Sequence, residues 1–217
     1  MNEEHYKKGT LKYMEAHELE MGESEDNDEV MNTYQEAALE LTQALSMGLP
    51  EEDEINAKTF LGSSLIAIAY RTYGANYVAS SEASLGAKYI EQAIYTDNKG
   101  RHNIFLKGDH AGFLFELDSI YYYNIIKIKE TDGIEAAISY GNEKFSLFNY
   151  FPENPFLYLL LQLGNLYAYK GDRENAITIY EAIINSKFWD IDKFHKQEYD
   201  QIKITAKQNL NVCKRQA

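Results

Sequence analysis

The sequence predicts an all-α fold of antiparallel helical hairpins stacked in chain order, and three observations support this prediction. The chain has only 3 prolines in 217 residues, whereas chains built from many short strands need frequent turn residues. Apolar residues recur at helical spacing along most of its length. Short polar segments rich in glycine, aspartate and asparagine separate these stretches. The β-branched and aromatic run at 121–129 lies inside a longer helical pattern, so we assign it to a helix as well.

Hairpins are expected wherever two helical patterns are joined by a short polar segment. We place these hairpins at 3–47, 50–96, 109–150 and 155–187, and a last amphipathic helix at 191–214. A chain of 217 residues is long enough for one or two domains, and we expect a single helical domain over residues 1–217.

Start and stop signals mark several helix ends. Pro50 precedes a run of acidic residues, which is typical of the first turn of a helix. Asp132 stands three residues before Glu135, the spacing of a capping box. Asn154–Pro155 predicts the start of the seventh helix, with the asparagine as N-cap. The polar segment 96–102 predicts a break after the fourth helix.

The sequence contains few residues in patterns suited to catalysis, metal binding or phosphate binding. Cys213 is the one cysteine, which excludes an internal disulfide framework and a cysteine-based zinc site; its position on an apolar stripe indicates packing. No two of the five histidines lie three to five residues apart, and phosphate-binding loop motifs are absent. We therefore expect no catalytic residues, no metal and no cofactor, and we predict that the chain is not an enzyme.

The charge is strongly negative and uneven. The net charge is −13; residues 1–60 carry 16 acidic and four basic side chains, whereas residues 187–217 carry four acidic and seven basic ones. Such acidity disfavours nucleic-acid binding, because phosphates are repelled. It favours either solubility alone or attraction of a basic partner. The N-terminal residues lack an apolar core, so we expect no signal peptide, and no apolar run is long enough to span a membrane; a cytoplasmic location is therefore expected.

A repeated pattern links the second helices of the hairpins. The triplets Ala37-Leu41-Ala44, Gly86-Ile90-Ala93 and Ala176-Tyr180-Ile183 each step by four and then three residues. Gln43–Leu45 and Gln92–Ile94 repeat almost literally at a spacing of 49. Self-similarity of this kind is what stacked helical hairpins produce.

One stretch resembles a known family. Leu163-Gly164, Tyr167, the Gly171-Asp172 turn, Ala176 and Tyr180 resemble the tetratricopeptide repeat (TPR) pattern. The resemblance implies a TPR-like right-handed solenoid, with paired helices closest where Gly164 meets the small face around Ala176. Gly62 and Ala93 look like a weaker copy of that pair. The last helix would cap the array, and an irregular bundle containing one real repeat is the alternative.

In the TPR family the first helix of each hairpin lines a concave groove that binds peptides or partner helices. The matching positions here are Tyr158, Leu161, Asn165, Ala168 and Tyr169, and in the weaker copy Asn56, Thr59, Ser63 and Ile66. The resemblance thus implies a protein- or peptide-binding scaffold, although the groove lacks the basic residues of a carboxylate clamp.

The alternative function is an acidic inhibitor, immunity-type or regulatory protein that meets a basic partner through its N-terminal third. The oligomeric state is left open by the sequence.

Overall fold

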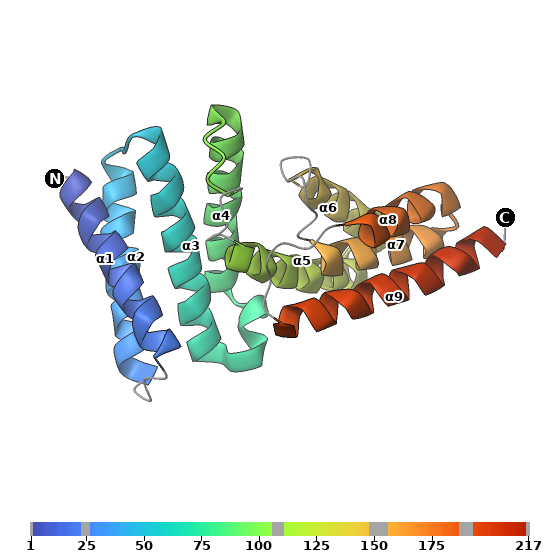
Figure 1. Cartoon of the computed structure of the whole chain (residues 1–217), viewed down its shortest axis with the longest axis horizontal. Coiled ribbons are helices and arrows are strands. Elements are labelled where there is room, and N and C mark those ends of the chain that lie inside the picture. Colours follow the sequence, from blue (N-terminus) through green and yellow to red (C-terminus); the bar gives the residue numbers. More distant parts are fainter. Residues whose placement is uncertain (1, 23–26, 106–110, 148–155, 187–192, 216–217) are drawn as a thin grey trace. The chain divides into compact units, whose positions relative to one another are not determined.

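A computed structural model describes residues 2–22, 27–105, 111–147, 156–186 and 193–215 (Figure 1). Over these ranges the chain is all-helical, with no strand, and the run at 121–129 is helical as predicted. The elements are α1 (Asn2–Met21), α2 (Asn27–Ser46), α3 (Glu51–Tyr73), the 3-10 helix η1 (Gly74–Ala79), α4 (Ser81–Gly100), α5 (Ala111–Thr131), α6 (Ile134–Ser146), α7 (Leu157–Lys170), α8 (Arg173–Asn185) and α9 (Lys193–Arg215).

The helices group into two compact units. Unit 1 covers residues 1–105 and holds α1 to α4, while unit 2 covers residues 106–217 and holds α5 to α9. In each unit every helix packs against the next one in the chain. That order of packing is the one expected for successive hairpins, whereas a single domain over residues 1–217 stays a prediction.

A second set of contacts joins alternate helices. α1 touches α3 in unit 1, and α7 touches both α5 and α9 in unit 2. Among the described residues, no such contact joins α2 to α4 or α6 to α8. The odd-numbered helices of each unit therefore lie closer together than the even-numbered ones.

Glycine allows α3 and α4 to cross at very short range. A Cβ atom on Gly62 would lie 2.6 Å from the carbonyl oxygen of Gly86 and 2.6 Å from Cγ1 of Ile90. A Cβ atom on Gly86 would lie 2.5 Å from the carbonyl oxygen of Gly62. Gly62 and Ala93 were expected as a weaker copy of the repeat contact; the atoms nearest to the added Cβ belong to Gly86 and Ile90, and Ala93 is buried.

Gly164 marks the corresponding approach of α7 and α8. A Cβ atom there would lie 2.7 Å from the ring of Tyr180 and 3.2 Å from Cγ2 of Ile179, so the two helices approach closely at this glycine. The atoms nearest to that position belong to Tyr180, one turn beyond Ala176, and Ala176 itself is buried. The Tyr167 hydroxyl, on the same helix, donates to Asn142 Oδ1 on α6 over 3.0 Å.

Several helix ends differ from the prediction. α4 continues through 96–100 and ends at Arg101, whose φ of 56° is left-handed, so the predicted break at Thr96 was wrong. The helix can continue because the buried Asp97 accepts from the backbone N–H of Ile104 and thereby folds the next segment back onto the helix.

The two predicted helix caps have different outcomes. Gly133, with φ 92°, is the N-cap of α6, and the Asp132 carboxylate accepts instead from the Thr131 hydroxyl. The capping box was therefore wrong, because the chain needs a left-handed glycine at that turn. Asn154–Pro155 lies outside the described residues; α7 begins at Leu157.

Candidate functional site

Aromatic side chains from three odd-numbered helices meet in unit 2. Phe115 and Tyr122 on α5 lie edge-on to Tyr158 on α7, with ring centroids 6.4 Å and 5.8 Å apart. Tyr199 on α9 lies 6.2 Å from Tyr158 and 6.3 Å from Phe115. These four residues are here called the aromatic cluster, and Tyr158 is the one among them that was predicted to line a groove.

A carboxylate borders the aromatic cluster. The Tyr158 hydroxyl donates to Glu198 Oε2 over 2.7 Å. Burial, followed by the neighbouring Glu198 carboxylate, raises the pKa of Tyr158. Burial likewise raises the pKa of Tyr199, with the Asp118 carboxyl as the next cause. The phenols therefore stay protonated at neutral pH. Tyr199 is buried, whereas Phe115, Tyr122 and Tyr158 are half-buried, so these three rings and the Glu198 carboxylate are what the cluster offers to apolar or cationic side chains.

Asp118 on α5 holds α7 in place beneath the aromatic cluster. It is fully buried, and its two carboxyl oxygens accept from the backbone N–H groups of Tyr158 and Leu159, each over 2.9 Å. These donors belong to the first turn of α7, so Asp118 acts as a helix cap supplied by another helix. Burial raises the pKa of Asp118 to about 7, against the lowering effect of the backbone donors. The group is therefore a positioning residue for Tyr158.

The predicted groove residues of α7 are partly covered by α9. Asn165 Oδ1 accepts from the Tyr180 hydroxyl over 2.8 Å and from Asn209 Nδ2 over 2.9 Å. Leu161 is half-buried, and Tyr169 is 77% exposed. The structure thus places these residues on one helix face, of which only the end near Tyr169 is open.

The predicted groove residues of α3 are either buried or in contact with α1. Thr59 is fully buried and its hydroxyl donates to a carbonyl of its own helix; Ile66 is buried too, so neither lines a groove and that prediction was wrong. Ser63 lies 3.4 Å from the Tyr13 hydroxyl of α1, and Asn56 bonds another tyrosine of α1, Tyr6. The reason is that α1 packs over this part of α3.

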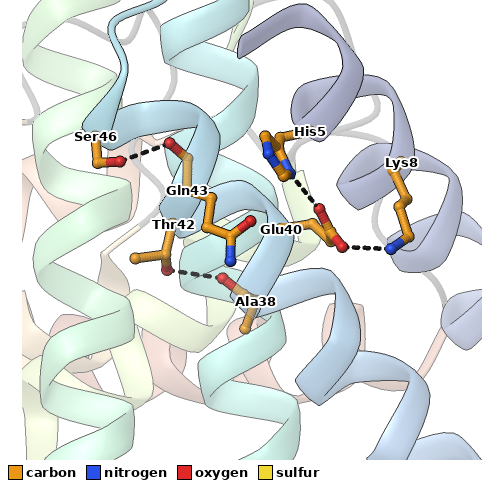
Figure 2. A network of polar contacts seen from close by, with 7 residues as sticks. All are labelled: His5, Lys8, Ala38, Glu40, Thr42, Gln43 and Ser46. Carbon is orange, nitrogen blue, oxygen red and sulfur yellow. Dashed lines mark hydrogen bonds and ion pairs between the residues drawn. The ribbon is translucent and has the colours of Figure 1, made fainter. Parts of the chain in front are cut away.

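Figure 2 shows a polar network between α1 and α2. The buried Glu40 carboxylate lies 2.6 Å from His5 Nδ1 and 2.5 Å from Lys8 Nζ. The bond with His5, followed by the bond with Lys8, lowers the pKa of Glu40. The Thr42 and Ser46 hydroxyls in the same view donate to backbone carbonyls of α2, so no nucleophile is paired with the carboxylate. The network fastens α1 to α2.

Replacing Glu40 with glutamine is expected to lower the free energy of unfolding at pH 7 by about 1–2 kcal/mol, because two charge-assisted bonds are lost. The folded-state pKa of Glu40 is below its usual value of 4.5. Its contribution is therefore complete above the unfolded-state pKa and disappears as the pH falls through the folded-state pKa.

Urea unfolding followed by circular dichroism at neutral and acidic pH measures this effect. The difference between wild type and Glu40→Gln should shrink toward the acidic end. Glu36→Gln is the matched control, since Glu36 forms an exposed ion pair with Lys12 and should change stability little. An unchanged difference at both ends would contradict the assignment.

Sequence reasoning missed Asp118, Glu198 and Glu40. Asp118 carried a weak signal, as one of two acids, with Glu116, in the largely apolar stretch 113–125. Within the described ranges, no group of three or more histidine, cysteine, aspartate or glutamate side chains is placed to hold a metal ion. Cys213 is buried, as predicted.

The described part of the chain also contains no helix that combines the length and the apolar character needed to cross a membrane.

Comparisons with known proteins give one structural likeness. No protein-family model matches the chain, and no curated protein matches it. The chain is similar to the crystal structure of a de novo designed helical repeat protein, with 15% identity and a TM-score of 0.37 over 99% of this chain and 98% of that one. At this TM-score the backbones do not superpose closely. The fold class, an all-helical chain of consecutively packed helices, rests on the contacts described above.

Proposed function

We propose that the chain is a non-enzymatic scaffold with a TPR-like right-handed arrangement, which binds a protein or peptide segment on its odd-numbered helices. The observation that carries this proposal is the contact between alternate odd helices, α1 with α3 and α7 with α5 and α9. In a curved stack, elements on the inner side approach one another while those on the outer side spread apart. The odd helices would then line the concave side of each unit.

The residues on that side suit binding. Tyr158, Leu161, Asn165 and Tyr169 follow each other at three, four and four residues, so they share one face of α7. Tyrosines combine ring area with a hydroxyl and are enriched among residues that dominate binding energies. The open Tyr169 end and the half-buried Tyr122 are the parts of this face that a ligand would reach.

α9 fits the role of a capping helix in such an array. One side of it is buried, through Tyr199, Ile202, Ala206, Leu210 and Cys213. Lys196, Lys207 and Lys214 are exposed, while Lys203 is half-buried and donates to the Ser186 carbonyl. Apart from Ile204 and Val212, the exposed side of α9 is polar, and a polar outer side over a buried stripe is what a terminal repeat needs.

The contacts of the acidic residues support a non-enzymatic role, and the net charge supports the choice of a protein partner. Asp118 and Glu198 are bonded to the backbone of α7 and to Tyr158, so neither is a free acid or base. The net charge of −13 favours a protein partner over nucleic acid. We propose a cytoplasmic protein without cofactor or metal on the same grounds as in the sequence analysis.

Selection from a random peptide display library tests the function. Peptides enriched on the wild-type chain are expected to bind Tyr169→Ala at least about tenfold more weakly, a loss of about 1.4 kcal/mol. Tyr95→Ala is the matched control, since Tyr95 is an exposed tyrosine on the even-numbered helix α4. Equal losses in both variants, or no enriched peptide, would count against the proposal.

A further inference from the structure

The outward side of α1 carries apolar residues that no described helix covers. Leu11 and Met21 are 70% and 73% exposed, and Met14 is 47% exposed. Together with Glu18 they fall within a sector of about 80° on the helix, here called the α1 stripe. The opposite side of α1, through Gly9, Tyr13 and Ala16, is the side that is buried.

The surroundings of the α1 stripe are acidic. α1 and α2 together carry nine acidic residues and three lysines. Glu4 and Glu18 are exposed and form no ion pair with any described residue, in contrast to Glu3, which is bonded to Lys7. An exposed apolar stripe with uncompensated acids beside it favours a partner that is both apolar and basic.

The same chain contains a helix with those two properties. α9 carries six basic and two acidic residues. On its outward side Ile204 and Val212 are about half exposed, within a sector of about 80°. Lys207, beside Ile204, is exposed and forms no ion pair with the described residues. Ile204, Lys207 and Val212 are here called the α9 stripe.

We propose that the α9 stripe of one copy of this chain docks on the α1 stripe of another copy. Met14 and Met21 are separated by about 10.5 Å along the helix, and Ile204 and Val212 by about 12 Å, so the apolar side chains can pair in register. Lys207 would then face Glu18. One contact of this kind covers both apolar stripes and neutralises opposite charges, which a foreign partner on α1 alone would not do.

The contact is heterologous, because each copy offers α1 to one neighbour and α9 to another. Repetition gives a ring if the rotation closes and an open filament if it does not. The two stripes include neither the α7 residues nor Tyr122, which are the residues proposed to bind a peptide, so the two proposals fail separately.

Sedimentation velocity of the purified full chain over an about hundredfold range of concentration tests the proposal. The average mass is expected to rise with concentration and to fall when salt is added, because the charged part of the contact is screened. A monomer at every concentration would overturn the proposal, as it would mean that α9 does not reach a second copy.

A charge exchange tests the pairing itself. Glu18→Lys alone and Lys207→Glu alone should each weaken association about tenfold, because like charges then face each other. An equal mixture of the two variants should restore association, since every contact between unlike variants again joins opposite charges. A mixture as weak as its components would overturn the proposed register.

Apolar variants separate self-docking from other occupants. Leu11→Ser should weaken association about tenfold, whereas Leu85→Ser, at an exposed leucine of α4, should leave it unchanged. Self-association that is weakened by Leu11→Ser but not by Lys207→Glu would overturn the role of α9. So would a chain that stays monomeric while binding a synthetic basic amphipathic peptide on α1.

Discussion

Gly62→Ala is expected to lower the free energy of unfolding by about 1–3 kcal/mol, even though alanine gains about 1 kcal/mol of helix propensity over glycine. The new Cβ atom would lie 2.6 Å from the Gly86 carbonyl oxygen. That oxygen belongs to the backbone of α4, so the whole helix has to move away. Chemical denaturation followed by circular dichroism measures the change.

Two further variants make this result specific. Ser84→Ala, at an exposed position of α4, improves propensity without adding bulk and should not destabilise the chain. The double variant Gly62→Ala with Gly86→Ala should cost less than the two single losses added together, because one displacement of the helices accommodates both methyl groups. A Gly62→Ala chain as stable as wild type would contradict the crossing.

Gly164 provides a graded comparison. Its added Cβ would meet the ring of Tyr180, a side chain, in place of a backbone oxygen. A ring can shift more easily than a helix, so Gly164→Ala should cost less than Gly62→Ala.

Asp118→Ala is expected to cost about 2–4 kcal/mol of unfolding free energy. It removes the acceptors of the Tyr158 and Leu159 N–H groups in a buried place and leaves a cavity. Glu130→Ala, at an exposed position of the same helix, is the matched control and should change stability by less than about 0.5 kcal/mol.

The pH dependence of Asp118 adds a second test. Its folded-state pKa is raised to about 7, whereas the pKa of an aspartate in an unfolded chain is about 3.9. Between these two pKa values the folded state keeps a proton that the unfolded state has lost. The contribution of Asp118 to the free energy of unfolding therefore falls as the pH rises and is constant above about pH 7. Asp118→Asn removes that dependence, and its stability relative to wild type should therefore rise from pH 5 to pH 8. An unchanged difference would contradict the raised pKa.

The sequence was sufficient for features that depend on neighbours along the chain. Helical periodicity located the helices. The 121–129 run was assigned correctly because it lies inside a helical pattern too long for a strand, although its β-branched residues favour a strand. The glycine at Gly164 indicated a close helix contact because nothing else compensates its low helix propensity.

Features that depend on the register between helices could not be read from the sequence. Asp118 caps α7 from 40 residues away, and no local pattern reports such a partner. Thr59 looked polar, but a threonine that donates to its own helix carbonyl can be buried. Whether Ala176 or Tyr180 faces Gly164 depends on a shift of one helical turn, which periodicity does not fix.

The pattern of helix contacts also has a kinetic consequence. Because each helix meets partners no more than two helices away in the chain, the contact order of each unit is low, and closing its loops costs little entropy. Each unit should therefore fold rapidly, and its first structure can form at any adjacent helix pair before it spreads to the others.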